Sequence, residues 1–129
     1  MSDKKILKKI LIADDEPGIR ELVRRVLSKD YVVVEAQNGV EAVNITHSQK
    51  PDLILLDIMM PEMDGLTACN TIKKESATKQ IPVVMLTAMG GDISKKLAKD
   101  AFGADAYITK PFSPQEILDT IGRFLKGPA

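Results

Sequence analysis

The sequence predicts an α/β fold in which five β–α repeats, (βα)5, form a doubly wound, five-stranded parallel sheet. Short apolar runs alternate with amphipathic segments along the chain of 129 residues, which is typical of strands alternating with helices. Three runs are nearly continuous in valine, isoleucine and leucine, as in parallel strands that are buried on both faces. Helix start signals follow the runs, and no linker or low-complexity segment separates the repeats. The repeats are therefore expected to fold as one domain.

Five apolar runs are predicted to be the strands. They occupy residues 9–14, 31–36, 52–57, 82–87 and 105–110. Each has the length of an ordinary strand, and each is separated from the next by a segment long enough for a crossover helix.

The segments between the runs have the period of helices. In the first and the last of them, apolar residues recur three, four, seven or eight positions apart, which places them on one stripe of a helix. These residues are Ile19, Leu22, Val23, Val26 and Leu27 in the first segment, and Ile117, Leu118, Ile121, Phe124 and Leu125 in the last.

Capping residues mark where helices should begin and end. The stretch SPQE, which starts at Ser113, is a capping box with proline at the first helical position. Asn38 and Asp64 are predicted to cap the second and third helices, and Pro17 to open the first. Gly103 stands where a fourth helix should stop.

Composition excludes several classes of protein. The 18 basic and 18 acidic side chains cancel, which argues against direct binding of nucleic acid. A single cysteine rules out a disulfide within the chain and fits a reducing compartment. No run is long enough to span a membrane, and lysines interrupt the N-terminal apolar stretch. We expect a cytoplasmic protein with one domain, residues 1–129, and a flexible tail at residues 1–8.

Polar residues stand at the predicted carboxyl ends of four strands. In an open α/β sheet these ends meet at one edge, where ligands bind, so we expect the side chains to lie together. They comprise three carboxylates, a hydroxyl next to a small residue, and an ammonium: Asp14, Asp15, Asp57, Thr87 with Ala88, and Lys110.

This set of residues suits phosphoryl chemistry. An all-oxygen carboxylate cluster fits Mg²⁺, which commonly binds one or two carboxylates together with waters and a phosphate oxygen. Lys110 is a point charge suited to phosphate. Asp57 can then act as a carboxylate nucleophile, because carboxylates accept phosphoryl groups as aspartyl phosphates.

Four blocks of the sequence resemble the receiver domain of response regulators in two-component signalling. The resemblance extends from about residue 9 to about residue 125 and implies the flavodoxin-like strand order 2-1-3-4-5. It is specific, because five positions match in order and spacing. The blocks are ILIADDEPGIRELV, PDLILLDIMMPEMDG, PVVMLTA and GADAYITKPFSPQEIL.

The resemblance implies a role for each residue of the predicted site. Asp57 would be the phosphoacceptor. Asp15 would bind Mg²⁺ directly, Asp14 would hold it through water, and the backbone carbonyl of Met59 would be a further ligand. Residues at the ends of the fourth and fifth strands would serve the phosphoryl group: Thr87 as the switch hydroxyl, Ala88 as a small residue leaving it access, and Lys110, before a cis Pro111, as its cation.

The implied function is a phosphorylation-controlled switch. A histidine kinase or phosphotransfer protein would donate the phosphoryl group, and Thr87 would move toward it. Tyr107 would turn from an exposed to a buried position. The surface of the fourth helix, fifth strand and fifth helix would then change and control a downstream protein, with the receiver either a monomer or a phosphorylation-dependent dimer. An alternative is a receiver that belongs to a longer DNA-binding response regulator.

Other functions fit less well. A phosphatase of the haloacid-dehalogenase type needs an acid at the position of Met59, so we do not expect an enzyme that acts on other substrates. A degenerate receiver would lack one of the five site positions, and nucleotide-binding glycine motifs are absent. Met59 orients water poorly, and Met89 follows Thr87 by two residues, which together suggest a long-lived phosphoryl state.

Several of these residues also have purely structural interpretations. Asp14 and Asp15 would be favoured at the N-terminus of any helix. Tyr107 would suit an ordinary strand. His47 is expected to be a C-terminal helix residue, and Cys69 a half-buried helix residue without thiolate character.

Overall fold

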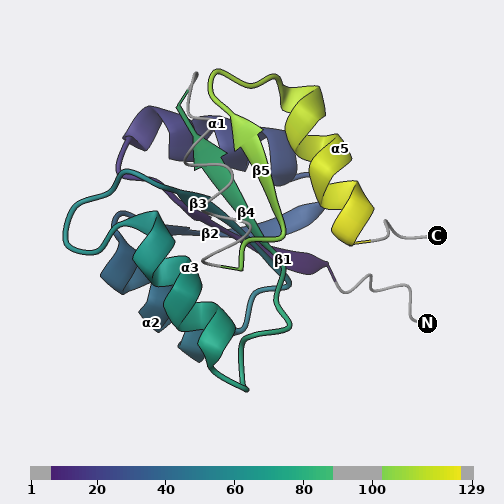
Figure 1. Cartoon of the computed structure of the whole chain (residues 1–129). Helices are drawn as coiled ribbons and strands as arrows, with labels where there is room; N and C mark the ends of the chain where they lie inside the picture. Colours follow the sequence, from purple (N-terminus) through teal and green to yellow (C-terminus); the bar gives the residue numbers. More distant parts are fainter. Residues whose placement is uncertain (1–6, 89–102, 126–129) are drawn as a thin grey trace, which may run out of the picture.

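A computed structural model describes residues 7–88 and 103–125 of the chain (Figure 1). The predicted fourth helix and Met89 lie outside these residues. The elements follow one another as β1 (Lys8–Ala13), α1 (Pro17–Leu27), β2 (Tyr31–Ala36), α2 (Gly39–Gln49), β3 (Leu53–Asp57), α3 (Gly65–Lys74), β4 (Val83–Thr87), β5 (Ala106–Thr109) and α5 (Pro114–Phe124).

All five strands form one parallel sheet in the order β2-β1-β3-β4-β5. This confirms the predicted order 2-1-3-4-5. In this order β2 lies on one side of β1 and the later strands lie on the other, so the strand order reverses between β1 and β3. No helix in the described part of the chain combines the length and hydropathy that crossing a bilayer requires.

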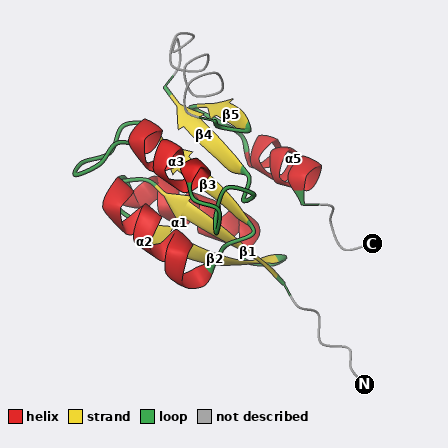
Figure 2. Ribbon diagram, turned by 60° about the horizontal axis from the view of Figure 1, so that its bottom comes forward, coloured by secondary structure: helices red, strands yellow, loops and turns green. Residues whose placement is uncertain are grey.

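The sheet is buried on both faces, which explains the continuous apolar runs. Successive side chains of a strand point to opposite faces, so alternate residues of the central strands join two separate cores. Leu11, Ile54 and Met85 pack with α2 and α3, whereas Ile12, Leu55 and Leu86 pack with α1 and α5. Figures 1 and 2 show the two helix pairs on opposite sides of the sheet.

Several boundaries differ from the predictions. β1 begins at Lys8, inside the expected tail, because Lys8 pairs in register with Tyr31 of the neighbouring strand. Leu22 was expected in the buried stripe of α1 but is 37% exposed, since Val23 and Leu27 take the face toward the sheet. Cys69 is fully buried rather than half-buried, and burial, partly offset by nearby Lys73, raises the pKa of its thiol to about 11.

The predicted helix starts are confirmed. Pro17 is the first residue of α1, and the side chains of Asn38 and Asp64 accept hydrogen bonds from backbone amides in the first turns of α2 and α3. Ser113 and Glu116 form both hydrogen bonds of a capping box at α5. His47 lies in the last turn of α2, as expected, with its Nε2 3.1 Å from a carboxylate oxygen of Glu75.

Two glycines allow backbones to approach closely beside the end of β3. A Cβ on Gly65, at the start of α3, would overlap the carbonyl oxygen of Asp57, and a Cβ on Gly39 would overlap that of Met63. Gly65 also donates its N–H to the carbonyl of Ile58 at 2.8 Å. The loop that follows Asp57 is therefore fixed against α2 and α3 by contacts that only glycine permits.

We expect Gly65→Ala to destabilise the fold, because the added methyl group meets backbone that cannot rotate away. Overpacking of this kind costs about 1–3 kcal/mol. Gly122→Ala is the matched control, since Gly122 lies in α5 with nothing within 4 Å of an added Cβ, and alanine there should add about 0.5–1 kcal/mol of stability. Urea unfolding of both variants measures the difference, and equal effects would contradict this account of the glycine.

Candidate functional site

The predicted site residues meet at the carboxyl edge of the sheet. A cavity of about 610 Å³ opens there between the ends of β1, β3, β4 and β5. It is lined by Asp15, Glu16, Asp57, Ile58, Met59, Thr87, Ala88 and Lys110. Asp14 is completely buried next to it. The prediction that three carboxylates, one hydroxyl and one ammonium share this edge is thus confirmed.

Three aspartates form a cluster with oxygen atoms close enough to share one ion. Asp14, Asp15 and Asp57 each offer a carboxylate oxygen, and these three atoms all lie within 4.8 Å of one another. Asp14 and Asp57 are buried, whereas Asp15 is exposed. Such a set of hard oxygen ligands, open to solvent on one side, suits Mg²⁺.

Lys110 provides the positive charge that lets two buried carboxylates coexist. Its Nζ lies 2.8 Å from Oδ2 of Asp14, 3.4 Å from Oδ1 of Asp57 and 3.4 Å from Oε1 of Glu16. Burial opposes the charged lysine, but the hydrogen bond that Lys110 donates to Asp14 and the charge of Asp57 outweigh this effect and raise the pKa of Lys110. The peptide bond to Pro111 is cis, as predicted.

The carboxyl group of Asp57 is held in an environment that favours its neutral form. Burial and then the charge of Asp14 raise its pKa from 3.8 to about 6, although Lys110 and the backbone N–H of Met59 act in the opposite direction. A cation placed among these carboxylates would oppose both effects, because it favours the ionised form of Asp57. The perturbed carboxyl group is therefore a candidate for the chemical role.

Thr87 contributes a buried hydroxyl group to the cavity. The residue is 1% exposed, and its Oγ1 has no hydrogen-bond partner among the described residues. An unpaired buried hydroxyl is costly, so this oxygen is suited to a ligand group that enters the cavity. It lies beside Asp57 and Lys110 in the lining of the cavity.

Met59 lies at the cavity, whereas Tyr107 lies at a separate hollow. Met59 lines the cavity and is 75% exposed. Tyr107 lies on β5, is 40% exposed and lines a second hollow with residues of α5. Its exposed state matches the starting point of the predicted switch, and the switch itself stays a prediction.

Two residues that the sequence analysis did not single out also belong to this region. Glu16 follows the two aspartates directly, lines the cavity and contacts Lys110. Arg20, one turn into α1, donates from Nη1 to the backbone carbonyl of Asp14 at 2.7 Å. Adjacency to the aspartates is a signal for Glu16, but no pattern in the sequence distinguishes Arg20 from Arg24 or Arg25.

The family model described as "Response regulator receiver domain" matches residues 10–122. The chain belongs to this family. The match includes all the residues that line the cavity, from Asp15 to Lys110, so the resemblance inferred from the four sequence blocks is confirmed for the receiver as a whole.

Named relatives of this receiver domain are longer proteins. It is 43% identical over 119 residues to the transcriptional regulatory protein ResD of Bacillus subtilis, covering 92% of the chain and 48% of ResD. It is 40% identical over 121 residues to the DNA-binding dual master transcriptional regulator RpaA of a Synechocystis strain, covering 93% of the chain and 50% of RpaA. The chain thus spans about half the length of these relatives.

A solved receiver structure has the same fold. The chemotaxis response regulator CheY4 of Vibrio cholerae is similar with a TM-score of 0.85 and 32% identity, over 93% of this chain and all of that one. The strand order and the position of the cavity at the carboxyl edge are therefore those expected of a receiver domain.

The raised pKa of Asp57 predicts how the stability of the metal-free receiver depends on pH. A carboxyl group whose pKa is higher when folded contributes stability that is complete below its unfolded value near 4 and is lost as pH rises through about 6. At pH 7 the ionised Asp57 then costs about 2–3 kcal/mol. Asp57→Asn, in a chelator, should raise the free energy of unfolding at pH 7 by that order and flatten its dependence between pH 4 and 6.

Asp64→Asn is the control for this prediction. Asp64 is an exposed N-cap in the same loop, and asparagine caps a helix equally well. Unfolding by urea at several pH values gives the comparison. The same gain in both variants would show that burial of Asp57 is not the cause.

Proposed function

We propose that this receiver domain is a phosphoacceptor switch in which Asp57 takes a phosphoryl group from a histidine kinase or phosphotransfer protein. The observation that carries the proposal is the buried Asp57 carboxylate, 3.4 Å from the Lys110 ammonium, in a cavity with the unpaired Thr87 hydroxyl. Acceptance of a phosphoryl group needs a nucleophile together with groups that position the phosphoryl oxygens and neutralise their charge.

In the transfer step, a carboxylate oxygen of Asp57 attacks phosphorus. A P–O bond forms as the P–N bond to the donor imidazole breaks, and the imidazole nitrogen leaves with the electron pair. Lys110, already within hydrogen-bonding distance of Asp14, would turn toward the phosphoryl oxygens and balance their charge. Ala88, small and exposed at the cavity wall, leaves access for the donor.

The acid cluster fits Mg²⁺ as the cofactor. The residues that would hold it are Asp14, Asp15, Asp57 and the backbone carbonyl of Met59; three of them contribute carboxylates that converge within 4.8 Å. When bound, Mg²⁺ would neutralise charge on the carboxylates and the phosphoryl oxygens. It would also offset the charge of Asp14, which adds to the larger effect of burial in raising the pKa of Asp57.

The switch follows from the unpaired hydroxyl. The phosphoryl group on Asp57 would carry about two negative charges and several acceptor oxygens. Oγ1 of Thr87 would donate to one of them, and Tyr107 would turn from its exposed position toward the space that Thr87 leaves. To change from mostly off to mostly on, the active state must gain roughly 3–5 kcal/mol. The altered surface around β5 and α5 would then bind a downstream protein or a second receiver.

A second possibility is that this receiver controls a DNA-binding domain in the same polypeptide. The observation that favours it is that relatives named as transcriptional regulators are about twice as long as the region they share with this chain. The receiver itself has no net charge, so contact with DNA would belong to the other domain. Both possibilities share the same phosphoacceptor.

Incubation with acetyl phosphate should add one phosphoryl group to the native chain, and only when Mg²⁺ is present. Asp57→Asn should add none, because the amide is not a carboxylate nucleophile. Asp64→Asn, changed in the same loop but outside the cavity, should behave as the native chain does. Intact mass spectrometry gives the result, and phosphorylation of Asp57→Asn, or of the native chain in a chelator, would refute the assignment.

The phosphoryl group should be long-lived, because the Met59 side chain at the cavity offers no hydrogen bond to orient an attacking water. Met59→Asn should shorten the half-life several-fold, since an amide can position that water. The decay of the phosphorylated mass after removal of acetyl phosphate measures it, with Asp64→Asn as the control. A native half-life of seconds would contradict the prediction.

A further inference from the structure

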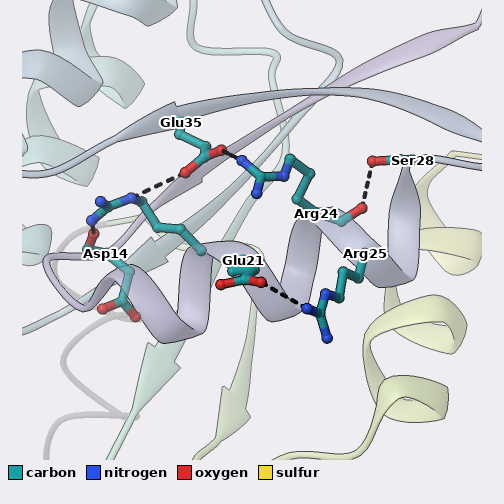
Figure 3. Close-up of polar contacts among 7 residues, drawn as sticks. Asp14, Glu21, Arg24, Arg25, Ser28 and Glu35 are labelled. Carbon is teal, nitrogen blue, oxygen red and sulfur yellow. Dashed lines mark hydrogen bonds and ion pairs between the residues drawn. The ribbon is translucent and has the colours of Figure 1, made fainter.

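A charged network connects the acid cluster to the edge of the sheet. Arg20, on α1, donates from Nη1 to the backbone carbonyl of Asp14 at 2.7 Å and from Nε to Oε1 of Glu35 at 3.1 Å. Arg24 donates to the other oxygen of Glu35 at 2.7 Å. Figure 3 shows Glu35, from β2, in contact with Arg24 above the α1 helix, with Asp14 at the far end of the network.

We propose that Arg20 is a positioning residue that holds Asp14 in the orientation needed to bind Mg²⁺. The inference rests on the proposed function of the site. Arg20 does not line the cavity, so it acts through the backbone of Asp14 and not by touching a ligand.

The hydrogen bonds of Asp14 show why its carbonyl matters. Its N–H donates to the carbonyl of Ala36 at 3.1 Å, Oδ1 accepts from the N–H of Glu16 at 2.9 Å, and Oδ2 accepts from Lys110 at 2.8 Å. The bond from Arg20 to the carbonyl completes the set. Every polar group of this fully buried residue is then paired, which fixes both its backbone and its carboxylate.

Loss of the Arg20 contact would leave the backbone carbonyl of Asp14 without its hydrogen-bond donor. The peptide plane between Asp14 and Asp15 carries the carbonyl that Arg20 binds, so rotation of that plane would turn Asp15 as well as Asp14. Both aspartates belong to the cluster whose oxygens lie within 4.8 Å. Partners of metal ligands commonly contribute 10–100-fold to metal affinity by this kind of orientation.

The geometry requires arginine and not merely a positive charge. The guanidinium group uses two different nitrogens for two partners, Asp14 in the turn after β1 and Glu35 in β2. Lysine has a single nitrogen at the end of a flexible chain and cannot reproduce this fork. Arg20 is 13% exposed, so packing around its stem further limits how a replacement side chain can move.

The network offers a matched control for a purely structural role. Arg24 binds the same Glu35 and joins α1 to β2, whereas the hydrogen bond to Asp14 comes from Arg20. It is 50% exposed. If the network serves only to join α1 to the sheet, replacing Arg24 should affect the site as much as replacing Arg20.

The test compares Arg20→Lys, Arg24→Lys and Glu35→Gln in the full chain. Titration calorimetry with MgCl₂ measures affinity, and amide hydrogen exchange of Glu16 in metal-free protein measures how firmly Oδ1 of Asp14 is held. Arg20→Lys should weaken Mg²⁺ binding about tenfold and speed exchange at Glu16. Glu35→Gln should give a smaller loss in the same direction, and Arg24→Lys should change neither quantity more than about twofold.

The same variants separate positioning from chemistry. The Mg²⁺ concentration for half-maximal phosphorylation by acetyl phosphate should rise about tenfold in Arg20→Lys, in step with the loss of affinity, while the rate at saturating Mg²⁺ stays within about twofold. This split is not expected from a general loss of stability. Circular dichroism shows whether each variant is folded. If Arg20→Lys does not fold, the loss of Mg²⁺ affinity in Glu35→Gln tests the inference instead.

Several results would overturn the inference. Native Mg²⁺ affinity and native exchange at Glu16 in Arg20→Lys would do so, as would equal losses in Arg20→Lys and Arg24→Lys. Failure of the proposed function looks different, because the native chain would then take up no phosphoryl group although the variants differed in Mg²⁺ affinity. If the native chain bound no Mg²⁺, unchanged exchange at Glu16 would refute the positioning of Asp14, and faster exchange would support it.

Discussion

The contact between the Lys110 ammonium and the carboxylates of Asp14 and Asp57 is the interaction on which the rest of the site depends. Without this cation, two buried carboxylates would face each other across the edge of the sheet at a high electrostatic cost. With it, Asp14 stays fully buried and Asp57 retains a pKa of only about 6. Lys110 is thus one cation beside three carboxylates. A second cation, such as Mg²⁺, would further reduce the repulsion among them.

The fold brings the two aspartates and Lys110 together at one edge of the sheet. The central strands β1, β3 and β4 are buried between two separate cores, and the switch in strand order between β1 and β3 leaves an opening at the carboxyl edge. Asp14, Asp57 and Lys110 each follow by two residues an apolar residue of the core beneath α1 and α5. Strand alternation thus aims all three in a common direction.

Two residues outside the cavity hold the backbone of the aspartates in place. Gly65 lets α3 approach the carbonyl of Asp57, and Arg20 binds the carbonyl of Asp14. Both act on backbone, where small rotations would move a carboxylate by a large distance. By contrast, Thr87 has a buried hydroxyl group without a partner in the described structure. The site combines fixed acids with one group able to respond to a new charge, which is the combination that a switch needs.

The sequence by itself determined the fold class, the strand order through the family resemblance, the helix caps and the five site positions, because these depend on local patterns: apolar runs, capping boxes and residues at strand ends. Tertiary structure decided which aspartate is buried, the exposure of Leu22 and the roles of Glu16 and Arg20. Asp14 and Asp15 are adjacent and chemically identical, so only the surroundings separate them. Likewise Arg20, Arg24 and Arg25 are equivalent in sequence, and only the path of β2 and the turn after β1 makes Arg20 the one that meets Asp14.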